Sequence, residues 1–76
     1  MPIYKGAYYC IEFSDIDRDA DRAGVHPFNK NGKAYGYDVI DSGTGEVVDT
    51  IYGPSEKAAE YNAVAYVQDH GGIAIV

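Results

Sequence analysis

The feature that most constrains the fold is a pair of strand-like segments separated by a glycine-rich turn. The side chains of residues 33–41 alternate between two sides, with tyrosine and valine on one of them, which is typical of a β-strand. The turn at residues 42–45 has the sequence Ser-Gly-Thr-Gly, and residues 46–52 have the composition of a second strand. The sequence therefore predicts a β-hairpin, which commits the chain to a sheet.

Three further elements are expected on either side of the hairpin. Residues 3–13 are rich in β-branched and aromatic residues and predict another strand. The better core face of that strand consists of Ile3, Ala7, Tyr9, Ile11 and Phe13. The Gly-Pro-Ser sequence at residues 53–55 opens a helix that is expected to run to about His70, before two glycines. Residues 73–76 predict a short terminal strand.

The expected long helix has an apolar side that includes alanines, which would let it lie close to a sheet. Its apolar positions include Ala58, Tyr61, Val64, Ala65, Tyr66 and Val67. Glu56, Lys57 and Glu60 mark the side that faces water. Val64 and Val67 lie near that wet side, so a partner could cover them.

Residues 14–24, with the sequence SDIDRDADRAG, carry the signals of a short helix. A serine at the start, acids in the first turn and a glycine after the last turn are start and stop signals. Ile16, Ala20 and Ala23 have the spacing of a narrow apolar stripe. The alternative is an extended acidic loop, because aspartate is a poor helix former. We expect the helix, followed by a turn region at residues 25–32.

The elements follow in the order β-α-β-β-α-β, which fits a small α+β domain. We expect an antiparallel sheet that is covered on one face by the long C-terminal helix, in a single domain over residues 1–76. A chain of this length buries only about 60% of its extended-chain surface, so its core is marginal. The other sheet face is expected to stay partly wet, which suits a chain with eight tyrosines.

The charge balance excludes several kinds of partner. Twelve acidic against six basic residues give a formal net charge of -6. This argues against direct binding to nucleic acid or to an anionic membrane, since both need a basic surface. One cysteine excludes an internal disulfide and a cysteine-rich zinc site. Without a long apolar run or the features of a secretory signal, the chain is expected in the cytoplasm.

The most unusual local feature is an acidic run with alternating aspartates: Glu12, Asp15, Asp17, Asp19 and Asp21. A calcium-binding EF-hand loop needs a glycine at position six and a glutamate at position twelve, and both registers of the run lack them. An acidic surface that imitates nucleic-acid phosphates would attract a protein with a basic groove. The alternative is a solvated helix with local ion pairs, such as Asp15 with Arg18.

The hairpin adds two acids to this hypothesis. If the turn occupies residues 42–45, Asp38 directly faces Asp49, and like charges in that position are destabilising. The chain would tolerate such a pair for a cationic partner, or because water screens it. A slip of one residue removes the pairing. The expected partner-binding residues are therefore the acidic run together with Asp38 and Asp49.

No residue pattern indicates catalysis, a metal site or a cofactor. Cys10 has no neighbouring histidine in sequence to activate it and is expected to be a small, at least half-buried residue. His26 lies in the expected turn region, and His70 suits the C-terminus of a helix better than a metal site. The glycines of residues 42–45 join two strands, whereas a phosphate-binding loop leads into a helix. We therefore expect a protein that is not an enzyme and holds no cofactor or metal.

In size, charge and α+β layout, the chain resembles the small acidic inhibitors that phages and mobile elements use against bacterial defence systems. These are the anti-CRISPR and anti-restriction proteins. The resemblance is carried by the acidic run at residues 12–21 and by Asp38, Asp41, Glu46 and Asp49. It implies a stoichiometric inhibitor that occupies the basic nucleic-acid-binding site of a defence nuclease complex in the cytoplasm of a bacterial host.

The alternative hypothesis is a structural or regulatory phage or bacterial protein, again not an enzyme, that acts as a homo-oligomer. A homodimer would use Val64, Val67 and an exposed sheet face. A dimer that persists at high salt and does not respond to neutralisation of the acids would favour this alternative.

Overall fold

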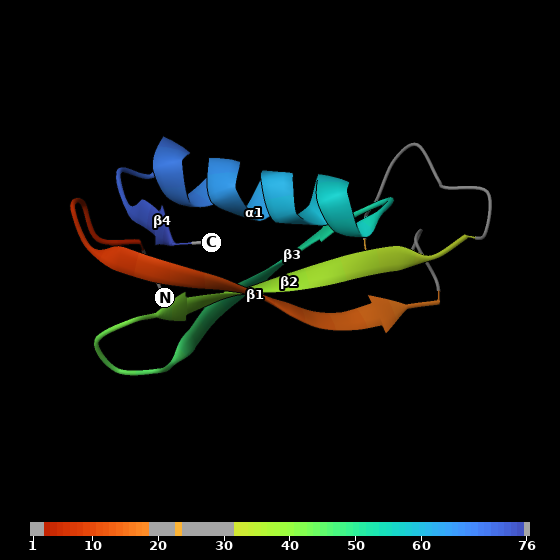
Figure 1. The fold of residues 1–76 in the computed structure, drawn as a ribbon, viewed down its shortest axis with the longest axis horizontal. Helices are drawn as coiled ribbons and strands as arrows, with labels where there is room; N and C mark the ends of the chain where they lie inside the picture. The colour runs from red at the N-terminus through yellow and green to blue at the C-terminus, as the bar shows by residue number, and fades with distance from the viewer. Residues whose placement is uncertain (1–2, 19–22, 24–31, 76) are drawn as a thin grey trace.

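The structure is a computed structural model that describes residues 3–18, 23 and 32–75. These residues form a four-stranded sheet and one helix. The strands are β1 (Tyr8–Asp17), β2 (Ala34–Asp41), β3 (Val47–Gly53) and β4 (Ile73–Ile75), and helix α1 (Glu56–Asp69) lies between β3 and β4 in the chain. Figure 1 shows α1 along one face of the sheet, while no described helix or strand covers the opposite face.

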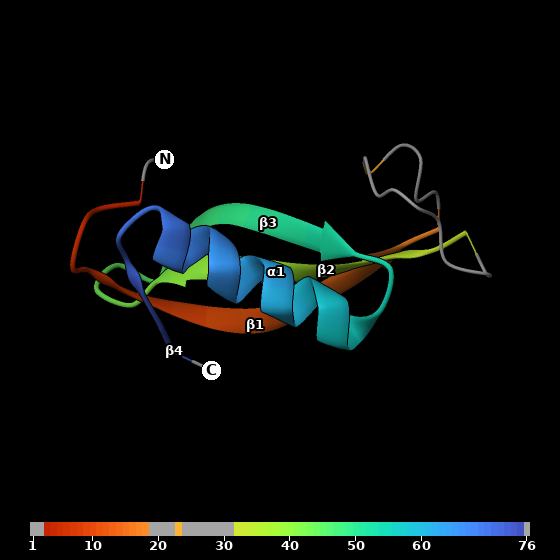
Figure 2. The same ribbon diagram turned by 90° about the horizontal axis from the view of Figure 1, so that it is seen from above.

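The strands lie in the order β3-β2-β1-β4. β2 pairs antiparallel with β1 and with β3, whereas β4 pairs parallel with β1. β3 and β4 therefore run in the same direction at the two edges of the sheet, and α1 is the crossover between them. Figure 2 shows this crossover from above, with α1 passing diagonally over the strands.

The α+β class, the hairpin and the long helix are confirmed, but three parts of the prediction are wrong. The sheet is mixed and not purely antiparallel, because β4 is parallel to β1. The described elements follow in the order β-β-β-α-β, and residues 14–17 belong to β1 and not to a short helix. The first strand also starts later than expected, at Tyr8. Residues 19–22 and 24–31, which complete the predicted helix and turn, lie outside the described residues.

β1 continues through the first part of the acidic run because its backbone pairs with β2 there. The pairs are Asp15 with Gly36, Ile16 with Tyr35 and Asp17 with Ala34. A ladder of backbone hydrogen bonds satisfies this segment, whereas a helix of two turns rich in aspartate has little stability of its own. The register shifts between Phe13 and Asp15, so one extra residue of β1 forms a bulge-type irregularity.

Both ends of α1 are capped as the sequence predicts. The Ser55 Oγ accepts a 3.1 Å hydrogen bond from the backbone N–H of Ala58. His70 is the C-cap residue, and its Nδ1 lies 2.8 Å from the carbonyl oxygen of Tyr66. Gly71 follows with a φ of 88°, a conformation that favours glycine, and turns the chain toward β4. Among the described residues, no helix has both the length and the apolar character that crossing a membrane requires.

The core lies between α1 and the sheet. Its buried members are Tyr9, Ile11, Val39, Ala63 and Val67. The inward positions predicted for the first strand are confirmed for Tyr9 and Ile11, but Phe13 remains 46% exposed. The Phe13 ring instead makes an edge-to-face contact with Tyr37, with the ring centroids 5.6 Å apart.

The buried side of α1 consists of the small residues Ala59 and Ala63 together with Val67. The predicted apolar side is wrong in part, since Tyr61 is 73% exposed. Val67 was expected near the wet side but is fully buried, and Val64 packs against the core cluster. Val67 therefore offers no surface to a second copy of the chain, whereas Val64 stays partly exposed.

The helix approaches the sheet most closely at Gly53, the last residue of β3. A Cβ atom at this position would lie 2.6 Å from the backbone nitrogen of Ala59 and 2.8 Å from its Cα. Both atoms belong to the helix backbone, which cannot turn aside as a flexible side chain can. Gly53 therefore sets the distance at which the first turns of α1 meet the sheet.

The variant Gly53→Ala is expected to lower the free energy of unfolding by about 1–3 kcal/mol, because α1 has to move away from β3. Urea denaturation followed by circular dichroism measures the change. Gly43→Ala is the control, since a Cβ there meets only a side-chain atom of Asp41, at 3.3 Å. Its stability should change by no more than about 0.5 kcal/mol. Equal losses in the two variants would contradict a special role for Gly53.

Candidate functional site

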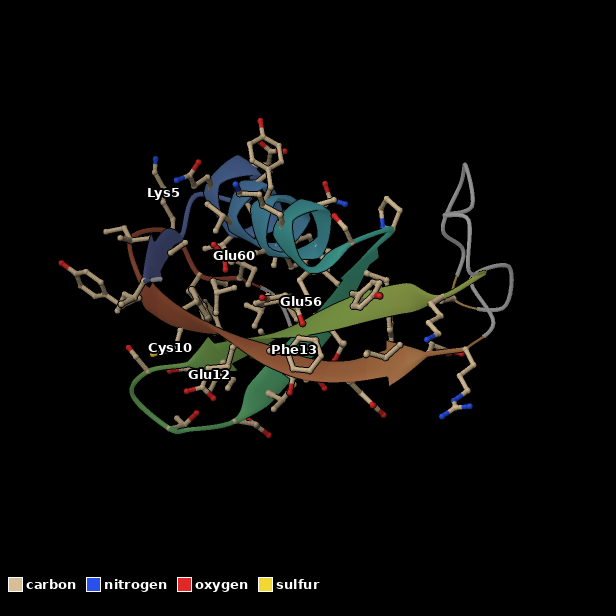
Figure 3. The ribbon with its side chains drawn as sticks, turned by 45° about the vertical axis from the view of Figure 1, so that its right-hand side comes forward. Lys5, Cys10, Glu12, Phe13, Glu56 and Glu60 are labelled. Atoms are coloured by element: carbon tan, nitrogen blue, oxygen red, sulfur yellow. The ribbon has the colours of Figure 1, made fainter. Side chains whose placement is uncertain are left out.

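The sheet face opposite α1, called the open face below, carries most of the predicted partner-binding residues. Ile11 and Val39 pack in the core under α1. Because successive side chains of a strand point to opposite faces, their neighbours in β1 and β2 lie on the open face. These neighbours are Cys10, Glu12, Asp38 and Ile40. Figure 3 shows Cys10 and Glu12 on the side of β1 that points away from α1.

One half of the open face is acidic. Glu12 lies directly opposite Asp38 in the pairing of β1 with β2. Asp15 pairs with Gly36, which is two residues from Asp38 in β2 and so shares its face. Asp17 follows two residues further along β1. The structure thus brings Glu12, Asp15, Asp17 and Asp38 together, with Glu12 and Asp15 exposed and the other two partly exposed.

The bulge in β1 decides that the aspartates lie on this face. Ile11 and Phe13 point to the α1 side, and strict alternation would put Asp15 on that side as well. The register shift between Phe13 and Asp15 moves Asp15 and Asp17 to the open face and turns Ile16, paired with Tyr35, toward the α1 side. A single inserted residue therefore decides which face of the sheet carries Asp15 and Asp17.

The predicted pairing of Asp38 with Asp49 is wrong. Asp38 lies opposite Thr50, and Asp49 lies opposite Val39. Next to the turn the strands keep the predicted register, but it shifts by one residue between Val39 and Ile40. The Thr50 hydroxyl donates a 2.6 Å hydrogen bond to the Asp38 Oδ1. A charge-assisted hydrogen bond therefore stands where the sequence predicted two like charges.

Asp49 lies on the face that α1 covers, where it meets Tyr66. Desolvation raises the pKa of Tyr66 above its ordinary value of 10.0, and Asp49 raises it further, by accepting a hydrogen bond and by its negative charge. Asp19 and Asp21 lie outside the described residues. The predicted partner-binding set is thus divided, with Asp49 separated from the acids of the open face.

The face under α1 also holds acids of its own. Burial raises the pKa of Tyr37, and the carboxylates of Glu60 and Glu56 add to the effect. Figure 3 shows both glutamates on the side of α1 that faces the sheet, above the strand that carries Phe13. Negative charge therefore surrounds β1 on both of its faces.

The other half of the open face is apolar. The sequence predicted an exposed sheet face but not the residues that make this half of it. Directly paired residues share a face, so an apolar row crosses all the strands of the described sheet. The row consists of Ile75, Cys10, Ile40 and Val47, and the pair Tyr8 and Ile73 extends it. Tyr8, Val47, Ile73 and Ile75 are each 43–55% exposed.

One sequence signal pointed to part of this row. The core face predicted for the first strand includes Tyr9 and Ile11, so alternation puts Tyr8 and Cys10 on the opposite side. The parallel pairing of β4 was not predicted, so Ile73 and Ile75 were not assigned to the same face. The register shift in the hairpin was not predicted either, so the faces of the β3 residues were not assigned correctly.

The chemical groups that the open face offers are carboxylates, one thiol and apolar side chains. Within residues 3–18, 23 and 32–75, no three His, Cys, Asp or Glu side chains form a group that could hold a metal ion. Cys10 is a partly buried free thiol, as expected, and lies between Ile40 and Ile75 in the apolar row. These apolar neighbours differ from the cationic surroundings that activate a cysteine.

Comparison of the chain with protein-family models, with curated proteins and with solved structures finds no match in any of the three. The functional interpretation therefore depends on the open face itself. That face offers a partner one acidic half and one apolar half side by side.

The variant Glu12→Gln is expected to raise the free energy of unfolding by about 0.2–1 kcal/mol at low salt, because it removes one of two like charges that lie opposite each other. The gain should shrink in about 1 M sodium chloride, where the Debye length is about 3 Å. Urea denaturation at both salt concentrations measures it. Glu46→Gln, at the exposed hairpin turn, is the control for net charge. The same gain in both variants would contradict a local repulsion between Glu12 and Asp38.

The protein is expected to lose stability as the pH rises above about 10, because folded Tyr66 keeps its proton to a higher pH than the unfolded chain does. Its contribution is fully present below the unfolded pKa and disappears as the pH rises through the folded pKa. Asp49→Asn should lower the folded pKa of Tyr66 and reduce this loss. Absorbance titration of the tyrosines and urea denaturation across this range measure both effects. Asp15→Asn, on the open face, is the matched control, and the stability of this variant should depend on pH as that of wild type does.

Proposed function

We propose that the protein is a stoichiometric inhibitor of the anti-CRISPR kind, and not an enzyme. In this proposal the open face occupies the nucleic-acid-binding site of a bacterial defence nuclease complex. The observation that carries it is the gathering of Glu12, Asp15, Asp17 and Asp38 on one sheet face that no described helix or strand covers. The net charge of -6 fits a basic protein partner and opposes binding to nucleic acid or to an anionic membrane.

The geometry of the acids supports this role. Side chains two residues apart on a strand are about 6.6 Å apart, and neighbouring strands are about 4.8 Å apart, so the carboxylates form a fixed grid. A nucleic-acid-binding site carries clustered lysine and arginine that would meet such a grid. The grid sits on paired strands, so the inhibitor binds without the deformation that DNA often undergoes. Its charge also steers the encounter and raises the association rate at low salt.

The homo-oligomer remains the second candidate, and the apolar half of the open face is the observation that favours it. Val67 is buried in the core and Val64 is partly buried against it, so the apolar row is the larger apolar surface for a second copy. The net charge of each copy opposes that contact. Sedimentation of the free protein at low and high salt separates this candidate from the inhibitor.

The immobilised protein is expected to retain a CRISPR effector complex or a restriction enzyme from a panel of purified complexes, and to block cleavage of its DNA. Retention should weaken as salt rises, because the contact is between opposite charges. The triple variant with Glu12→Gln, Asp15→Asn and Asp38→Asn should bind at least about tenfold more weakly. Asparagine at position 38 keeps an oxygen that can accept the Thr50 hydrogen bond.

The matched control removes three charges away from the open face, with Glu46→Gln, Glu56→Gln and Asp69→Asn. All three residues are exposed, and the variant has the same net charge as the open-face variant. It should retain the nuclease as wild type does. If both triple variants bound equally well, the acidic face would not be the contact. If wild type retained no nuclease at either salt, the inhibitor proposal itself would be wrong.

A further inference from the structure

We infer that the open face docks a partner segment that is both apolar and basic, of the kind that an amphipathic basic helix presents. Apolar side chains of that segment would sit on the row of Ile75, Cys10, Ile40 and Val47, with lysine or arginine over the acidic half. The inference depends on the proposed function only for the place where the partner binds. It adds that the partner carries apolar side chains as well as positive charge.

The apolar row has the properties of an interface and not of scattered surface residues. Its members are paired across neighbouring strands, so they form one continuous patch. Tyr8, Ile73 and Ile75 flank it at the β4 edge, and Val47 ends it at the β3 edge. Each of these four side chains exposes about half of its surface, within 43–55%. A contiguous exposed apolar patch with a polar rim is typical of a protein-binding site.

The acidic half begins directly beside the apolar row. Cys10 and Glu12 are two residues apart in β1, and Ile40 and Asp38 are two residues apart in β2. The two rows are therefore about 6.6 Å apart. Side chains three or four residues apart on a helix have a similar spacing of about 5–6 Å. A helix with an apolar stripe next to a basic stripe would match both rows at once.

The face fits a partner better than the free edge of β1 does. β4 pairs only with Tyr8, Tyr9 and Cys10, so residues 11–17 have no further strand beside them on that edge among the described residues. The bulge interrupts this edge, and the Asp15 Oδ1 accepts a 2.7 Å hydrogen bond from the Ile16 N–H. Bulges and charged side chains are the devices by which edges resist added strands.

Charge decides which occupant fits the face. A second copy would bring another net charge of -6 to an acidic surface, and an anionic membrane would be repelled as well. A basic amphipathic segment gains from both halves. Its charges accelerate association and lose their effect in salt, whereas its apolar contacts slow dissociation and persist in salt.

The test uses a peptide of about 18 residues with leucine and lysine in the pattern of an amphipathic helix. Its binding is measured by the changes in the amide chemical shifts of the isotope-labelled protein. Shifts should concentrate at Tyr8, Cys10, Glu12, Ile40 and Val47. The same peptide with glutamate in place of lysine should not bind. Shifts that concentrate on α1, or equal binding of both peptides, would overturn the inference.

Two variants separate the contributions of the apolar and acidic halves to peptide binding, which is measured at low salt and in about 0.5 M salt. Val47→Ser combined with Ile75→Ser should weaken peptide binding at least about tenfold at the higher salt, because apolar burial does not depend on screening. Glu12→Gln combined with Asp15→Asn should weaken it mainly at low salt. Tyr61→Ser, on the exposed side of α1, is the control and should bind as wild type does. Binding unaffected by the apolar variants would overturn the inference.

The nuclease panel distinguishes this inference from the proposed function. A nuclease whose capture depends on the acids, but is unchanged by the Val47→Ser and Ile75→Ser variant, would support the inhibitor proposal and overturn the inferred apolar contact. Peptide binding on the open face with no nuclease retained would uphold the contact and overturn the inhibitor. A salt-resistant dimer through the apolar row would overturn the inference in favour of a second copy.

Discussion

The close packing of α1 on one face of the sheet is the constraint from which the rest of the structure follows. Glycine permits it at both ends of the helix, at Gly53 against Ala59 and at Gly72, where a Cβ would lie 2.8 Å from Ile3 and 2.9 Å from Val67. In the described part of the chain, one helix covers one face and no second layer covers the other. The side chains of the open face are therefore not determined by packing in the core under α1.

The bulge in β1 decides which face of the sheet carries the aspartates of this strand. The extra residue between Phe13 and Asp15 turns Asp15 and Asp17 to the open face and Ile16 to the α1 side. On the α1 side Phe13 is still 46% exposed and Ile16 38% exposed, so this end of β1 lies beyond the buried core. The bulge therefore acts on the composition of the surface. With strict alternation Ile16 would lie on the open face in place of Asp15 and Asp17, and the acidic half of that face would be lost.

Much of the fold could be predicted because its signals are local. The hairpin turn, the Ser55 cap and the glycine after His70 each act within a few residues, and the structure confirms them. The prediction of a short helix failed at residues 14–17 because pairing with β2 outweighed local capping signals. The Asp38–Asp49 pair and the direction of β4 failed because register and strand order depend on distant residues. The candidate site was therefore predicted as a list of acids, without the bulge or the apolar row.

Solubility alone does not account for the open face. A net charge of -6 keeps a small protein in solution wherever its acids lie. Placing Glu12 opposite Asp38 adds local repulsion, and leaving Tyr8, Val47, Ile73 and Ile75 exposed on the same face favours association. Both features act against a free monomer that interacts with water only. Both become favourable when a basic, partly apolar surface covers the face, because the charges are then neutralised and the apolar row is buried.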